Sequence, residues 1–165
     1  MADKYQNELT ALLGRSGFVA IKNTDYHINS YGKKVFPNQG IPDTFFAGRL
    51  NRGGFVECKT GVGKYRQAFP FKNWRDDQRE WFANHDQAAY WLFIVLGKRI
   101  GAKKYPRIAL LMPAWAFTAW EERAERKSIP YKEAETSIWR LEWKDGHWSV
   151  PEYHLFHVQY IGGAK

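Results

Sequence analysis

The hydrophobic positions near the start of the chain recur every three or four residues, which is the spacing of one helix face. This stripe predicts a helix over about residues 4–13. The apolar residues that form it are Tyr5, Leu9, Leu12 and Leu13. On such a helix Glu8 lies about 40° from Leu12, at 100° per residue, so it borders the buried stripe.

Short apolar runs bounded by turn residues predict strands farther along the chain. A first strand is expected over 18–22. The runs on either side of the glycine-rich stretch 48–54 predict two short strands joined by a hairpin loop. Two nearly continuous apolar runs, 88–96 and 107–112, have the length of buried central strands.

A second helix is expected after Asn73. Asn73 is predicted to cap it, with Asp76 three residues on completing a capping box, so Asp76 is given a structural role. Gln78 then lies on the core side with Trp81 and Phe82, either directed at a functional site or satisfied as a buried amide.

The last third of the chain carries weaker patterns. A helix is expected over 114–126, then a hairpin with strands at 138–143 and 147–150, and a final strand over 153–160. The 165 residues are most simply one domain, with a motif-bearing core over about 4–113 and an extension from 114.

Charge changes the picture more than length does. The chain has a formal net charge of +8 and a pI near 9.6, which favours a polyanionic partner, nucleic acid first. The long stretch 23–40 and the basic, aromatic stretch 60–72 are expected to touch it. The cations expected to bind DNA are Lys33, Lys34, Arg49, Arg52, Lys64, Arg66 and Lys72.

Several classes of function are disfavoured. A single cysteine, Cys58, excludes an intrachain disulfide and disfavours a zinc site, so a reducing, intracellular setting is expected. No apolar run is long enough to span a bilayer, and the N-terminus lacks a signal-peptide core. The stretch 60–66 lacks the residues of a phosphate-binding loop, so no nucleotide cofactor is expected.

The strongest chemical signal lies on the predicted hairpin. Glu57 and Lys59 are two apart on a strand and share a face, whereas Val56 and Cys58 share the other. Antiparallel pairing would bring Asp43 close to Glu57. Two carboxylates with water and a phosphate oxygen suit Mg²⁺, and a neighbouring lysine can orient the attacking water. The alternative for these residues is a solvated face of a sheet.

These residues resemble the motifs of the PD-(D/E)XK nuclease superfamily. Within it, the chain is most similar to the Holliday junction resolvases of the archaeal and RecU types. Residues 40–43 resemble both types, and residues 69–74 followed by Gln78 resemble the RecU type. The resemblance covers about residues 4–97.

The resemblance implies an α/β fold with a central mixed sheet flanked by helices, a homodimer, and a Mg²⁺-dependent endonuclease in which Mn²⁺ substitutes. It implies that Asp43 and Glu57 are metal ligands and that Glu8 is an additional ligand. Lys59 would assist the attacking water and Gln78 would support the site. The stretch 23–40 would take the place of the segment that engages the centre of a DNA junction.

Other readings of the same sequence stay open. One is a nuclease of the same fold that acts on a specific sequence or on single strands. Another is a non-catalytic nucleic-acid-binding protein. A third is a protein-interaction module, motivated by Trp139, Trp143 and Trp148 in the C-terminal third.

Overall fold

The fold is built on a five-stranded mixed sheet with strand order β1-β4-β5-β7-β8. The computed structural model describes residues 2–23, 27–28, 30–35, 40–85, 89–98 and 104–162. β5 and β7 run parallel, and the other neighbouring strands pair antiparallel. The strands are β1 (Val19–Lys22), β4 (Thr44–Ala47), β5 (Gly53–Thr60), β7 (Tyr90–Leu96) and β8 (Ile108–Pro113).

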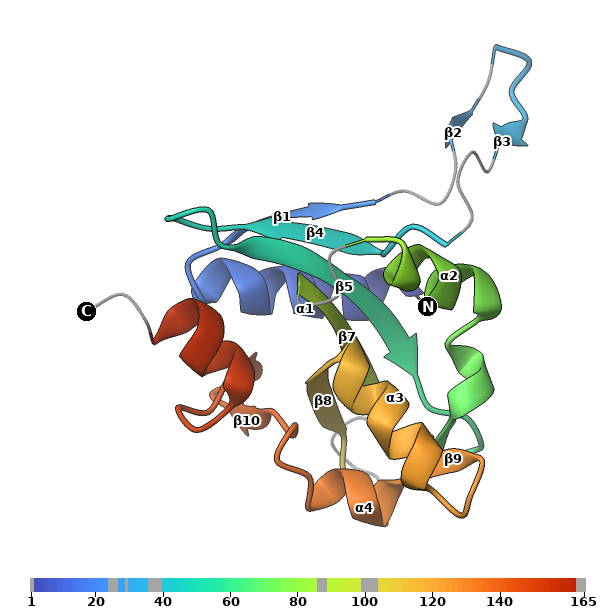
Figure 1. The fold of residues 1–165 in the computed structure, drawn as a ribbon, viewed down its shortest axis with the longest axis vertical. Coiled ribbons are helices and arrows are strands. Elements are labelled where there is room, and N and C mark those ends of the chain that lie inside the picture. The colour runs from blue at the N-terminus through green and yellow to red at the C-terminus, as the bar shows by residue number, and fades with distance from the viewer. Residues whose placement is uncertain are drawn as a thin grey trace.

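One face of the sheet is covered by α1 (Ala2–Arg15). Its buried stripe is the one that the sequence predicts: Tyr5, Leu9, Leu12 and Leu13. It packs against Val56 of β5 and Phe93 of β7. Figure 1 shows α1 running along the back of β1, β4 and β5.

The opposite face is covered by α2 (Asp76–Ala83) and α3 (Ala114–Arg123). Leu92 and Ile94, which alternate with Phe93 along β7, point to this side and pack with Phe117 of α3. With a helix layer on each face, β7 and β8 are buried along their whole length, as their continuous apolar runs predict. The predicted fold class, a central mixed sheet flanked by helices, is confirmed.

Four shorter elements lie outside the five-stranded sheet, and two of them form a second, two-stranded sheet. The pair β6 and β9 joins residues about sixty positions apart. The 3₁₀ turn η1 precedes α2, and α4 follows β9 directly. The bounds are β6 (Ala68–Pro70), η1 (Phe71–Asn73), β9 (Ser128–Pro130) and α4 (Tyr131–Glu135).

A hairpin of β10 (Glu142–Lys144) and β11 (His147–Ser149) confirms the predicted turn near the C-terminus. The expected final strand over 153–160 is wrong, because this segment is helical and ends in η3 (His157–Ile161), a π-helical segment. Phe156 and Tyr160, four residues apart, both pack their rings on Phe46, at centroid distances of 5.6 and 5.3 Å. In a strand, two residues four positions apart are separated by about 13 Å, too far for both rings to contact Phe46 at these distances.

The stretch 23–40 contains a short antiparallel pair, β2 (His27–Ile28) with β3 (Lys34–Val35). Figure 1 shows this pair standing clear of the main sheet and its helices. The rest of the expectation for this stretch falls on 24–26, 29 and 36–39, which lie outside the described residues. In the part of the chain that the structure describes, no helix is long and apolar enough to cross a membrane.

Candidate active site

The β4–β5 hairpin brings Asp43 and Glu57 together. Thr44 pairs with Val56, so the next position places Asp43 beside Glu57. The backbone N–H of Asp43 donates to Oε2 of Glu57 at 3.2 Å, and Oδ2 of Asp43 accepts from the backbone N–H of Cys58 at 2.7 Å. The proximity that the strand pattern predicts is therefore present.

Lys59 completes the group on the same face of β5. Its Nζ donates to Oε1 of Glu57 at 2.7 Å and to Oε1 of Gln78 at 2.8 Å. Gln78 in turn donates its Nε2 to Oε1 of Glu57. Val56 and Cys58 pack on the α1 side, as their alternation with Glu57 and Lys59 predicts. We call Asp43, Glu57, Lys59 and Gln78 the β5 cluster.

Gln78 also forms part of the start of α2, which the sequence analysis placed wrongly. The helix begins at Asp76 with Arg75 as its N-cap, whereas Asn73 lies in η1, so the capping role given to Asn73 and Asp76 is incorrect. Gln78 is the third helical residue, and its Oε1 accepts from the backbone N–H of Arg75 at 3.2 Å. One amide thus ties the helix start to the site, which explains its burial.

Glu57 is held in an unfavourable setting for a charge. It is 2% exposed. Burial, and then the neighbouring Asp43 carboxylate, raise the pKa of Glu57 from 4.5 to about 7, against the opposing effect of Lys59. Burial likewise raises the pKa of the Cys58 thiol well above its usual value, so this thiol is a packing group instead of a nucleophile.

Tyr90 is a buried neighbour that the sequence analysis missed. Burial first, and then the Glu57 charge, raise the pKa of its hydroxyl. It lies in the apolar run that starts β7, next to Trp74, with ring centroids 6.0 Å apart. Only the pairing of β7 with β5, which sets Tyr90 beside Phe55, reveals its link to the cluster.

Glu8 has different partners. Its Oε1 accepts from Nη1 of Arg107 at 2.7 Å, and its Oε2 accepts from Nε1 of Trp148 at 3.1 Å. It belongs to α1, on the other face of the sheet from Glu57. The structure does not bring Glu8 together with Asp43 and Glu57: within the described ranges, no three His, Cys, Asp or Glu side chains converge as a metal site would require.

The donor set nonetheless fits a hard cation at the hairpin. Asp43 and Glu57 supply carboxylate oxygens, and Mg²⁺ is commonly held by one or two carboxylates, with waters and substrate phosphates completing its shell. A cation there would also offset the repulsion between the two carboxylates that contributes to the raised pKa of Glu57.

The cations expected to bind DNA are spread over the molecule. Arg49 and Arg52 lie in the β4–β5 turn, at the end of the hairpin away from Asp43, and Arg52 donates Nη1 to the backbone carbonyl of Tyr160 at 3.0 Å. Lys33 is exposed beside β3. The side chain of Lys34 lies outside what the structure describes.

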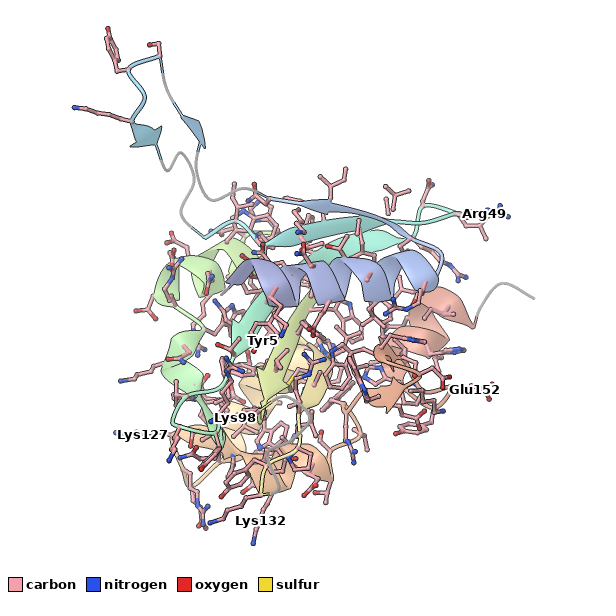
Figure 2. All side chains as sticks on the ribbon, turned by 180° about the vertical axis from the view of Figure 1, so that it is seen from behind. Tyr5, Arg49, Lys98, Lys127, Lys132 and Glu152 are labelled. Carbon is pink, nitrogen blue, oxygen red and sulfur yellow. The ribbon has the colours of Figure 1, made fainter. Side chains whose placement is uncertain are left out.

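The other three expected cations follow the cluster in the chain. Lys64 is exposed in the loop after β5, and Lys72 is exposed in η1. The guanidinium of Arg66 lies over the Tyr5 ring, 5.1 Å from its centroid. Figure 2 shows Arg49 at the upper right edge of the molecule, Tyr5 near its middle and Lys98 at its lower left.

No family model and no curated protein sequence matches this chain. Among solved structures it is similar to Hjc, a Holliday junction resolvase of the archaeal hyperthermophile Archaeoglobus fulgidus. The identity is 17% and the TM-score 0.45, over 79% of this chain and 89% of that one. This is the kind of protein that the motifs resemble, but a similarity of this size carries no argument for the activity of this chain.

Proposed function

We propose that the chain is a metal-dependent endonuclease that hydrolyses phosphodiester bonds in DNA, with four-way junctions as its preferred substrate. The observation that carries the proposal is the β5 cluster, in which two carboxylates and one amine converge on adjacent strands. The net charge of +8 supports a DNA partner.

Each residue of the cluster has a distinct part in the proposed reaction. Asp43 and Glu57 would hold Mg²⁺, or Mn²⁺ in its place, and the bound ion would supply Lewis-acid stabilisation of the phosphate and a more acidic water. Lys59 would orient the attacking water and stabilise negative charge as it develops on the phosphate. Gln78 keeps Lys59 in place through its Oε1 and Glu57 through its Nε2.

Glu8 is proposed as an additional ligand only on the strength of the motif. To serve as a ligand, its carboxylate would have to give up its hydrogen bonds with Arg107 and Trp148. The Asp43–Glu57 pair needs no such change.

Cleavage of a four-way junction into two duplexes needs paired nicks in strands of like polarity. A two-fold symmetric dimer supplies two equivalent sites for them, so a homodimer is part of the proposal. The competing proposals are a nuclease that acts on linear duplex or single strands, and a DNA-binding protein without catalysis.

The test is a cleavage assay with Mg²⁺ or Mn²⁺ on a synthetic four-way junction beside linear duplex and single strand of the same sequence. Symmetric nicks confined to the junction, lost with chelator and in Asp43→Asn, are the expected result. Asp76→Asn is the matched control, because Asp76 is an exposed acid on α2 outside the cluster. Asp43→Asn should still bind DNA, since it loses a negative charge near the phosphate.

Each other outcome selects a competitor. Equal cutting of every substrate would make the protein a general nuclease. Tight binding without cutting would make it a DNA-binding protein. A second readout is thermal unfolding: Mg²⁺ should raise the melting temperature of the wild type and of Asp76→Asn but not of Asp43→Asn.

A further inference from the structure

Two tyrosines and three lysines gather beyond the C-terminal ends of β5 and β7. The rings of Tyr65 and Tyr105 have centroids 6.0 Å apart. The ammonium groups of Lys98 and Lys64 lie 4.7 and 5.4 Å from the Tyr65 centroid, and that of Lys104 lies 5.8 Å from the Tyr105 centroid. These distances are within cation–π range. We call these five residues the tyrosine–lysine patch.

The backbone beneath the patch is anchored. Gly97 donates its N–H to the carbonyl of Arg66 at 3.0 Å, and Lys98 donates its N–H to the carbonyl of Tyr105 at 3.1 Å. Gly97 has a φ of 75°, and a Cβ there would lie 2.3 Å from the carbonyl oxygen of Pro106. These bonds hold the backbones at Arg66, Gly97–Lys98 and Tyr105 against one another beneath the patch.

The charges of the patch lack acidic partners in the part of the chain that the structure describes. No ion pair found there includes Lys64, Lys98 or Lys104, and all three are exposed, whereas Arg79 and Arg107 each pair with a glutamate. The three ammonium groups repel one another because they carry like charges, and an anion bound among them would reduce this repulsion. A polyanion gains most, because several charges are neutralised together.

The tyrosines favour phosphate over base as the group bound. Two ammonium groups already lie on the Tyr65 ring, so a stacked base would have to displace them. Tyr105 meets Tyr131 edge to face, at a centroid distance of 5.1 Å. The rings therefore position the lysines rather than offer open stacking surfaces.

The patch also lies at a suitable distance from the β5 cluster. Lys64 follows Lys59 by five residues, a span of at most about 18 Å in extended chain. Lys98 lies four residues beyond Ile94, the register partner of Lys59, which is at most about 14 Å along the strand direction. One DNA strand advances about 3.4 Å per phosphate along the helix axis, so these upper limits correspond to at most about five nucleotides.

We propose that the tyrosine–lysine patch binds the phosphate backbone of DNA within about five nucleotides of the bond cleaved at the β5 cluster. The placement relative to that bond rests on the proposed function. The binding of backbone phosphates by the patch does not, because it follows from its own charges and geometry. Lys98, Lys104 and the two tyrosines thereby extend the DNA-contacting surface beyond the cations expected from the sequence.

The test measures the affinity of the full chain for a short duplex and for a four-way junction in chelator, over a series of salt concentrations. Lys98→Ala should lower the slope of log affinity against log salt by about 0.9, and the triple variant K64A/K98A/K104A by about 2–3, one step per lost phosphate contact. Lys144→Ala, which removes an equal charge from the β10–β11 hairpin where Glu142 already pairs with it, should leave the slope unchanged.

Tyrosine variants test the positioning role. Tyr65→Leu should weaken binding about two- to fivefold by releasing Lys98 and Lys64, whereas Tyr65→Phe keeps a ring and should bind like the wild type. All variants change exposed or half-buried residues, and thermal unfolding confirms that each is folded before its affinity is compared.

The outcomes separate this inference from the proposed function. If the triple variant kept the wild-type salt slope while the wild type cut DNA, phosphate binding by the patch would be disproved and the proposed nuclease activity would be supported. If the triple variant had a smaller salt slope than the wild type while no substrate was cut, phosphate binding by the patch would be supported and the proposed nuclease activity would be disproved. Tyr65→Phe weakening binding as much as Tyr65→Leu would overturn the positioning role of the ring.

Discussion

Two glutamate–cation pairs lie on opposite faces of the same sheet and differ in what surrounds them. Glu57 pairs with Lys59 and Glu8 pairs with Arg107, each at 2.7 Å. The distances are equal, so the geometry of the two pairs alone does not distinguish them.

The neighbours make the distinction. Glu57 lies beside a second carboxylate, that of Asp43, whose charge contributes to the raised pKa of Glu57, and the backbone N–H of Asp43 donates to Oε2 of Glu57. Arg107, in contrast, is enclosed by the rings of Trp143 and Trp148, with its guanidinium 4.5 and 5.0 Å from their centroids.

The β5 cluster therefore holds two carboxylates beside one ammonium group and has an excess of negative charge. The Glu8–Arg107 pair is balanced, and it joins α1 to β8 and, through Trp148, to β11. These contacts link elements that are far apart in sequence.

Lys59→Met should lower single-turnover DNA cleavage by about 10²–10³-fold, the usual cost of losing one stabilising group in a transition state. DNA binding should persist, because one of many cations is removed. Arg107→Met is the comparison variant and should cut at a near wild-type rate under conditions where it is folded. Similar losses of activity in both variants would remove the distinction between the pairs.

The pH dependence of stability, measured without metal, should report the crowded carboxylates. Because the pKa of Glu57 is raised from 4.5 to about 7, the folded state binds a proton that the unfolded state has released over this range. The free energy of unfolding should therefore fall as the pH rises from 4.5 to 7, by about 3 kcal/mol at most relative to Glu57→Gln.

Chemical denaturation across that pH range measures the effect. Asp43→Asn removes the second cause of the shift, so its fall in stability should end at a lower pH than in the wild type. The opposite result would be a free energy of unfolding that rises with pH from 4.5 to 7 in the wild type relative to Glu57→Gln. It would contradict a raised pKa for Glu57.

Arg107→Met should reduce the free energy of unfolding by about 2–3 kcal/mol, because it leaves the Glu8 carboxylate without its cation in a partly desolvated place. The Arg107 side chain is 7% exposed and that of Glu8 is 20% exposed. The double variant with Glu8→Gln should regain part of the loss, as expected for a coupled pair. Additive losses in urea denaturation would show that the two residues act separately.

Local pattern was enough to predict the elements that carry the β5 cluster. Strand alternation places Glu57 and Lys59 on one face, and a hairpin of the predicted length brings Asp43 to them. Helical periodicity likewise predicts the buried stripe of α1. These features depend on residues near one another in the chain, so a regular period is sufficient to reveal them.

Prediction failed where a distant contact overrides the local pattern. The segment 153–160 has strand-like composition, yet Phe156 and Tyr160 pack on Phe46 in a helix. The sequence predicts Asn73 as the N-cap of α2, but the observed N-cap is Arg75. Gln78 in the first turn of the helix is bound to Lys59 of β5, a contact that the local sequence does not reveal. Neither contact has a signal in the neighbouring residues.

The amino-acid sequence by itself determined the periodic elements, the excess positive charge and the set Asp43, Glu57 and Lys59, because each follows from residue type and short-range spacing. Only the tertiary structure decided the partners of Glu8, which lie 99 and 140 positions away, and the gathering of Tyr65, Lys98 and Tyr105. The physical reason is that burial and charge pairing depend on which surfaces the sheet order brings together.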